Sequence, residues 1–232
     1  MAAQWMVAGF VHGVLNTDNM NITGESFDYG PWRFMPDYDP NFVAAYFDHG
    51  GLYRYGYQPS AVAWNLDRLA DALSLIAPRA ALAAALERFE DALWDEVVAG
   101  YVRRLGLTSR GHEADAELVG ALIDFLGESG APYQQVLHDW WGGAARTAQA
   151  LESPASDFYD HELFPDVRQR LRRYEPARPD LMDDPSHTAP EAADMLIDEV
   201  EALWAPIAAD DDWSTFDAKV AQLRALRLLP LS

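Results

Sequence analysis

A short polar stretch near the start of the chain holds the residues best suited to chemistry. It reads HGVLNTDNMNITGESFDYGPW over residues 12–32 and places Asp18 beside Asn19, with Asp28 a short distance further on. An amide oxygen and a carboxylate are hard oxygen ligands, and Mg²⁺ held by few protein groups completes its octahedron with water and substrate phosphates. The stretch therefore favours a metal ion that binds together with a nucleotide.

The spacing of these residues also predicts a geometry. The Gly-Glu pair at 24–25 suits a two-residue hairpin turn with glycine first, which would pair Thr23 with Ser26. Counting back from that pair places Asn19 and Asp28 on one face of the hairpin, as near neighbours across a strand pair whose diagonal positions lie roughly 7–8 Å apart. Side chains that extend from positions this far apart can bring an amide oxygen and a carboxylate oxygen onto one cation.

Asp18 would point away from the metal pair and be free to accept a proton or to orient a nucleophile. An alternative interpretation involves no chemistry. Asp18 and Asn19 would cap one turn and Asp28 would begin another, because short polar side chains bond readily to nearby backbone groups. The residues alone leave both interpretations open.

The charge of the chain limits the classes of molecule that it is expected to bind. Seventeen Lys and Arg residues against 37 Asp and Glu give a formal net charge of −20, which repels phosphate backbones and anionic lipid headgroups. We therefore expect neither nucleic acid nor membrane as a partner. The chain has no cysteine, which excludes disulfides and thiolate metal sites. It also lacks a membrane-spanning apolar run and the basic start of a secretory signal, so we expect a cytoplasmic protein.

The elements that must position these residues fall into two parts. Residues 1–60 are rich in Gly, Pro, Asn, Asp and aromatic residues with little helical period, which predicts a loop-rich functional region. After residue 60, apolar residues recur at spacings of three and four, which predicts amphipathic helices. These helices are expected at 61–76, 81–105, 113–127, 132–150 and 160–174.

The C-terminal part is expected to be a helical pair. A capping box beginning at Thr188 predicts a helix through about Ile207, and a last helix is expected to begin near Ser214. The prolines of RPDLMDDPSHTAP mark residues 178–190 as a candidate linker. We therefore predict one domain over 1–177, which carries the catalytic and metal-binding loops, and a helical pair over 191–232.

Four strings in the first part resemble a known family. They are HGVLNTDNM at 12–20, DYGPW at 28–32, DYDP at 37–40 and QPSAVAWNLDRLA at 58–70. Their wording, order and spacing are similar to those of the selenoprotein O family, also called YdiU or UPF0061, whose members are pseudokinase-type protein adenylyltransferases. The resemblance is dense over residues 5–70 and covers about the first third of the chain.

This resemblance implies a mainly α fold, namely a protein-kinase-like C-lobe with a short β-hairpin at the metal site and a C-terminal helical extension. Carried over residue by residue, it implies that Asp18 is the catalytic proton acceptor and that Asn19 and Asp28 bind Mg²⁺, with Mn²⁺ as an alternative ion. Asp28 would also contact ATP. The implied substrates are ATP and proteins, with AMP passing to a Ser, Thr or Tyr hydroxyl. His12 is expected to support the loop rather than to perform chemistry.

A kinase-like site also needs a glycine-rich loop and a lysine on the phosphates, and both precede the catalytic loop. Few residues precede His12, and the sole lysine is Lys219. We therefore expect the chain to correspond to the C-terminal part of such an enzyme and to be inactive alone. One alternative is a catalytically incomplete remnant that acts as a binding or regulatory module. Another is a conventional kinase lobe, which the absence of the His-Arg-Asp order disfavours.

Overall fold

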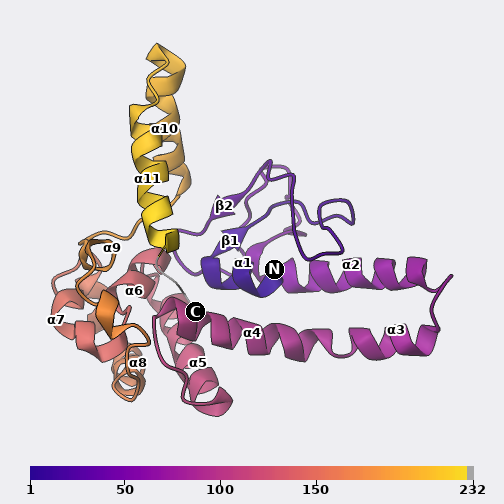
Figure 1. Cartoon of the computed structure of the whole chain (residues 1–232), viewed down its shortest axis with the longest axis horizontal. Helices are drawn as coiled ribbons and strands as arrows, with labels where there is room; N and C mark the ends of the chain where they lie inside the picture. The colour runs from indigo at the N-terminus through magenta and orange to yellow at the C-terminus, as the bar shows by residue number, and fades with distance from the viewer. Residues whose placement is uncertain (229–232) are drawn as a thin grey trace. The chain divides into compact units, whose positions relative to one another are not determined.

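The structure is a computed structural model that describes residues 1–228 (Figure 1). Its described part is mainly helical, with one antiparallel sheet of two short strands, which confirms the predicted helical class. The chain folds as two compact units. The first comprises Met1–Met35 and Asp39–Gly100, and the second comprises Pro36–Tyr38 and the chain from Tyr101 onward.

The first unit holds the predicted site residues. Its elements are α1 (Ala2–Ala8), β1 (Phe10–Val11), β2 (Arg33–Phe34), the 3₁₀ helix η1 (Tyr55–Tyr57), α2 (Gln58–Leu73), α3 (Arg79–Leu86) and most of α4 (Phe89–Arg104). The strands pair Phe10 with Phe34 and Val11 with Arg33, so the sheet closes off the segment between them. That segment contains the predicted catalytic and metal-binding loops.

Helix α1 is an exception within residues 1–60, which are predicted to be loop-rich with little helical period. Its apolar residues Trp5, Met6 and Val7 are buried, and it ends at Gly9, whose φ of 67° lies in the left-handed region that favours glycine. A helix of seven residues has two turns, which is too short for an apolar period to stand out from the sequence.

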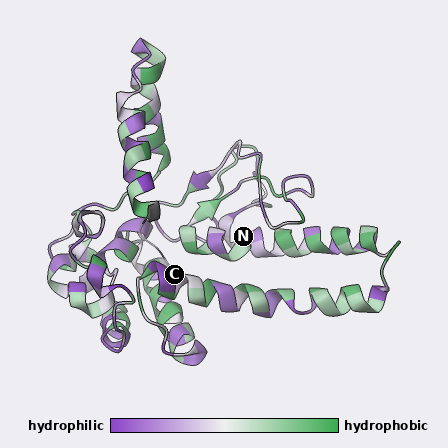
Figure 2. Cartoon of the chain, in the orientation of Figure 1, coloured by the Kyte–Doolittle hydropathy of each residue, from purple (hydrophilic) through white to green (hydrophobic). Residues whose placement is uncertain are grey.

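Helix α3 shows how the predicted helix over 81–105 is wrong in detail. The structure divides this range into α3 and α4, with a turn at Glu87 and Arg88. Figure 2 colours much of α3 as hydrophobic, yet none of its residues is buried. Leu75 and Ile76, in the turn before α3, are 89% and 84% exposed. The apolar period runs through the turn, so the pattern alone did not mark the break.

The second unit contains the remaining described elements. They are α5 (His112–Ser129), α6 (Tyr133–Asp139), η2 (Gly143–Arg146), α7 (Thr147–Ala150), η3 (Ser156–Asp160), α8 (Phe164–Leu171), η4 (Pro179–Leu181), α9 (Pro185–Thr188), α10 (Ile197–Asp210) and α11 (Ser214–Leu228). Its core is aromatic. The ring of Phe164 lies 4.9 Å from that of Phe125 and 5.0 Å from that of Trp140.

The predicted helix over 132–150 is also interrupted. It divides into α6, η2 and α7, and the break falls at Gly142 and Gly143, whose φ values are 84° and 73°. Two consecutive residues in the left-handed region cannot continue a right-handed helix. The side chain of Met182 and that of Leu107 lie where a Cβ would be at these two positions.

The capping box predicted at Thr188 is wrong. Asp184 is the capping residue, since its side chain accepts a hydrogen bond from the Ser186 N–H at 2.8 Å, and Thr188 ends α9. The next segment is held extended by the buried Gln135. Its side chain donates to the Pro190 carbonyl at 3.0 Å and accepts from the Ala192 N–H at 2.8 Å, so α10 begins only at Ile197.

The helix predicted from Ser214 is confirmed as α11, and it runs beside α10 (Figure 1). Lys219 on α11 donates to the Glu199 carboxylate on α10 at 2.6 Å, and its side chain is 8% exposed. The only lysine of the chain therefore forms an ion pair that joins α10 and α11. Residues 229–232 of the predicted pair lie outside the described residues, and the three-part division of the chain stays a prediction.

Among residues 1–228, every helix is too short or too polar to cross a membrane.

Candidate functional site

The site is built on two loops of the first unit, over residues 12–19 and 26–30. They meet through a bridge between Met20 and Ser26 and through the Phe27 N–H, which donates to the Asn19 carbonyl at 3.2 Å. The predicted pairing of Thr23 with Ser26 is therefore wrong. Gly24, with φ of 83°, closes a wider turn in which its N–H donates to the Asn21 carbonyl at 3.0 Å.

The structure nevertheless brings Asn19 and Asp28 together. The Asn19 side-chain N–H donates to the Asp28 carboxylate at 3.1 Å. Asn19 is buried at 3% exposure, whereas Asp28 is exposed and has a φ of 66°. A left-handed backbone at a residue other than glycine is uncommon, and Asp is among the residues that tolerate it. It occurs here at the residue whose carboxylate faces Asn19.

The amide of Asn19 is held in one orientation by its own turn. Its Oδ1 accepts a hydrogen bond from the Asn16 N–H at 3.1 Å, and its backbone N–H donates to the Asn16 carbonyl at 3.1 Å. An amide oxygen has two lone pairs, so Oδ1 keeps one for a further partner. The Nδ2 atom faces Asp28.

These two side chains carry oxygen atoms of the type that a hard divalent cation prefers. Among the described residues, the only hydrogen bond to the Asp28 carboxylate is on Oδ2, which leaves Oδ1 available. An amide oxygen and a carboxylate oxygen are the donor type that Mg²⁺ and Mn²⁺ prefer, although here the Asn19 Nδ2 atom, rather than Oδ1, faces the carboxylate. No three His, Asp or Glu side chains within residues 1–228 are grouped as a metal site. An ion at Asn19 and Asp28 would therefore take most of its ligands from water and phosphate.

Asp18 is placed beside this pair but does not contact it. Its side chain is exposed, and no hydrogen bond within the described part of the chain involves its carboxylate. The charge of Asp18 reaches the phenol of Tyr53. Burial raises the pKa of this phenol most, and the negative charges of Asp48 and Asp18 raise it further. An exposed carboxylate without a hydrogen-bond partner is available to accept a proton.

His12 joins the two loops from within. It is fully buried, and burial lowers its pKa, so the imidazole is neutral near pH 7. Its Nε2 lies 3.0 Å from the Phe27 carbonyl, which can only accept, so Nε2 carries the proton. The ring packs against Trp5 at 5.8 Å and Tyr29 at 5.1 Å. These are the contacts of a residue that positions Asp28 through its neighbours.

Two side chains of α2 position the loop, and both were missed from the sequence. Gln58 accepts from the His12 N–H at 3.0 Å and donates to the Phe10 carbonyl at 2.9 Å. Asn65 donates to the Leu15 carbonyl at 2.9 Å. They are two helical turns apart and so share one face. The signal that could have revealed them is a pair of amides on the buried face of an amphipathic helix.

Gly13 allows the two loops to approach each other. Its φ is 84°, and a Cβ at this position would lie 2.8 Å from Cγ of Pro31. Any other residue would therefore push the 28–32 segment away from the loop that carries Asn19. Gly13 and Pro31 therefore pack directly against each other.

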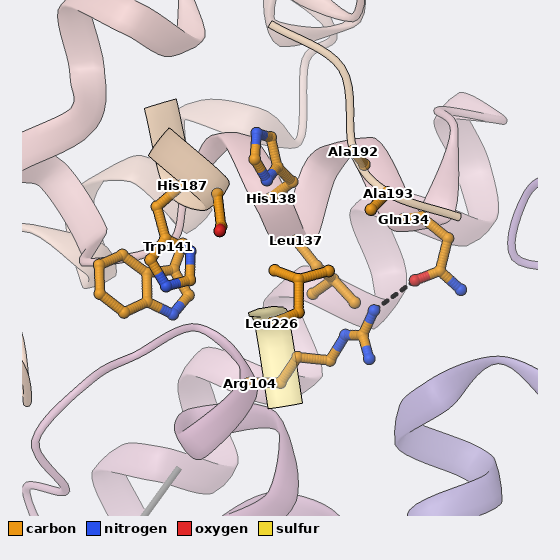
Figure 3. A pocket seen from close by; sticks show the side chains of 10 residues that line it. Arg104, Gln134, Leu137, His138, Trp141, His187, Ala192, Ala193 and Leu226 are labelled. Atoms are coloured by element: carbon orange, nitrogen blue, oxygen red, sulfur yellow. Dashed lines mark hydrogen bonds between the residues drawn. The ribbon is translucent and has the colours of Figure 1, made fainter. Parts of the chain in front are cut away.

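A separate pocket of about 260 Å³ lies in the second unit (Figure 3). His187 stacks on Trp141 in its wall with ring centroids 3.6 Å apart, and burial lowers the pKa of His187 to about 4. Figure 3 also shows the Arg104 guanidinium bonded to the Gln134 side chain. The residues that line the pocket include no carboxylate. No predicted site residue belongs to it.

Comparison with known proteins extends the resemblance beyond the first loops. A family model described as protein adenylyltransferase SelO matches residues 1–224. The chain belongs to the SelO family. The match to SelO covers far more of the chain than the four strings near its start, and includes the helical part after residue 80.

Relatives within the SelO family carry the name protein nucleotidyltransferase YdiU. One from Synechocystis sp. is 38% identical over 97% of this chain and 50% of its own length. One from Trichodesmium erythraeum is 36% identical over 93% of this chain and 47% of its own length. A Vibrio vulnificus protein is 42% identical over 57% of this chain and 27% of its own length. The chain thus spans about half the length of the first two relatives.

Proposed function

We propose that this chain supplies the catalytic and metal-binding part of a protein adenylyltransferase, in which AMP passes from ATP to a Ser, Thr or Tyr hydroxyl of a protein. The observation that carries the proposal is the contact of Asn19 with Asp28 at 3.1 Å, with the exposed Asp18 in the same loop. Membership of the SelO family supports it. In this proposal, the helical fold corresponds to the C-lobe of a protein kinase.

The proposed chemistry assigns one role to each side chain. Asn19 and Asp28 hold Mg²⁺, which neutralises phosphate charge when bound. The acceptor hydroxyl attacks the α-phosphorus of ATP, the bond from that phosphorus to the oxygen bridging the β-phosphate breaks, and pyrophosphate leaves. Asp18 takes the proton of the hydroxyl. His12, Gln58 and Asn65 keep these carboxylates in place through the backbone contacts described above.

The proposal places the groups that hold the ATP phosphates in the half of the relatives' length that this chain does not span. The chain has a net charge of −20, and its one lysine is paired with Glu199. Carboxylates in such a protein repel ATP unless cations from elsewhere hold it. We therefore expect the isolated chain to transfer AMP far more slowly than a protein of full family length.

The test is a chimera in which this chain replaces the matching half of the Synechocystis relative. The chimera is incubated with Mg²⁺ and with ATP labelled either on the α- or on the γ-phosphate. The proposal predicts that α-label enters protein, that γ-label does not, and that Asp28→Ala abolishes transfer while Asp37→Ala does not. Transfer of γ-label would identify a kinase instead, and undiminished α-label in a folded Asp28→Ala chimera would refute the assigned role.

A binding or regulatory module is the second candidate. The pairing of Lys219 with Glu199 favours it, since no other lysine of this chain is available to a phosphate. A chimera that binds Mg²⁺ and ATP by calorimetry but incorporates neither label would support this candidate. Incorporation of α-label would exclude it.

A further inference from the structure

Tyr53 lies in a turn whose backbone is fixed by one aspartate. The two carboxylate oxygens of Asp48 accept hydrogen bonds from the Leu52 and Tyr53 N–H groups, each at 2.8 Å. A carboxylate that closes a turn in this way restricts the backbone that follows it. The backbone from which the Tyr53 side chain extends is therefore held in one conformation.

The phenol contacts the loop that carries the metal pair. Tyr53 Oη donates a hydrogen bond of 2.5 Å to Oδ1 of Asn16, which is 37 residues away in the chain. The Asn16 N–H donates to Oδ1 of Asn19, and the Asn19 amide donates to Asp28, both at 3.1 Å. Three hydrogen bonds thus run in series from Tyr53 to Asp28.

We propose that Tyr53 and Asn16 are positioning residues for the metal-binding pair, a role that rests on the proposed function of Asn19 and Asp28. Asn16 is exposed, and its side chain has one hydrogen bond within the described residues, the one from Tyr53. That bond fixes Asn16, whose N–H then sets the orientation of the Asn19 amide. The Asn19 side-chain amide, which contacts Asp28, is therefore oriented from outside the metal-binding pair.

The phenol keeps its proton and so remains a donor at neutral pH. Burial and the nearby carboxylates of Asp48 and Asp18 raise its pKa above the usual value of about 10. Groups that orient metal ligands through hydrogen bonds typically change metal affinity by about 10–100-fold when they are removed. Because Tyr53 acts through Asn16 and the hydrogen bond between them is exposed to water, we expect the lower end of that range.

The test uses the 232-residue chain with Mn²⁺ as the probe, titrated by electron paramagnetic resonance. Tyr53→Phe and Asn16→Ala should each weaken Mn²⁺ binding about tenfold, and the double variant should lose no more than either single variant. The matched control is Tyr57→Phe, since the Tyr57 hydroxyl makes no hydrogen bond within the described residues. This control should bind Mn²⁺ as the wild type does.

A second measurement separates the positioning role from the metal site itself. In the metal-free ¹⁵N-labelled chain, Tyr53→Phe should shift the side-chain NH₂ resonances of Asn19 and speed their exchange with water, while Tyr57→Phe leaves both unchanged. Unchanged Asn19 resonances in Tyr53→Phe would overturn the inference. If the wild-type chain binds no Mn²⁺, the metal site proposed under the function fails, and the Asn19 resonances still decide whether Tyr53 orients that side chain.

Discussion

Gln58→Met tests whether α2 holds the catalytic loop in place. Gln58 is fully buried and bonds two backbone groups, the His12 N–H at the start of the loop and the carbonyl of Phe10 in β1. Methionine has nearly the same volume and shape, so the substitution removes the hydrogen bonds with little change in packing. The two backbone groups then lose their side-chain partner.

The expected cost follows from those two groups. A buried backbone donor or acceptor left without a partner costs about 1–3 kcal/mol, and the carbonyl loses less because it has two lone pairs. We therefore expect Gln58→Met to lower the free energy of unfolding by about 3 kcal/mol. For a chain of this size that corresponds to a fall in Tm of about 6–12 °C. Because the same loop carries Asn19, Mn²⁺ affinity should fall as well.

The assay is urea denaturation followed by tryptophan fluorescence, with Ser60→Met as the control. Ser60 is exposed on the same turn of α2, and the control should change stability by less than about 0.5 kcal/mol. If Gln58→Met is as stable as Ser60→Met and binds Mn²⁺ with wild-type affinity, the two hydrogen bonds do not hold the loop. The account of how α2 positions the site would then be wrong.

Two further predictions concern the second unit. Gly106 and Gly130 have φ values of 62° and 64°, but a Cβ would lie 2.6 Å from the Trp141 ring at Gly106 and touch nothing at Gly130. Gly106→Ala should therefore cost about 3 kcal/mol in unfolding free energy and Gly130→Ala about 1 kcal/mol, and equal losses would contradict the role of the ring. His187 has a pKa lowered to about 4 by burial, against 6.5 unfolded. The unfolded chain takes up this proton first, so stability is full above pH 6.5 and is lost as the pH falls toward 4. Denaturation at pH 7 and pH 5 should show a loss of about 2 kcal/mol in wild type that His187→Phe, which keeps the ring stack, largely removes; identical losses in both proteins would refute it.

The convergence of Asn19 and Asp28 could be predicted from the sequence, but the register that produces it could not. Gly24 has a positive φ in the structure, and the predicted two-residue turn also requires a positive φ at this glycine. That conformation can close a two-residue turn or a wider loop, and the sequence pattern does not distinguish them. The wider loop pairs Met20 with Ser26 and brings Asn19 opposite Phe27, so the two side chains meet by a different path from the one predicted.

The supporting contacts could not be predicted because they join residues far apart in the chain. Gln58 bonds to His12 and Tyr53 to Asn16 across 46 and 37 residues, and no local pattern records such pairs. Helices with a long apolar period, such as α5, were predicted closely. Breaks set by tertiary contacts were not, as the extended segment held by Gln135 shows.

The central claim is that Asn19 and Asp28 together bind a divalent metal ion. The most direct measurement adds Mn²⁺ below stoichiometry to the ¹⁵N-labelled chain and follows paramagnetic broadening of its NMR signals. The account predicts that the Asn19 side-chain amide and the Asp28 backbone amide broaden first, and that Asp28→Ala leaves the Asn19 signal sharp at the same Mn²⁺ concentration. Broadening centred on the aspartates at 210–212, with the Asn19 amide still sharp in the wild-type chain, would contradict it.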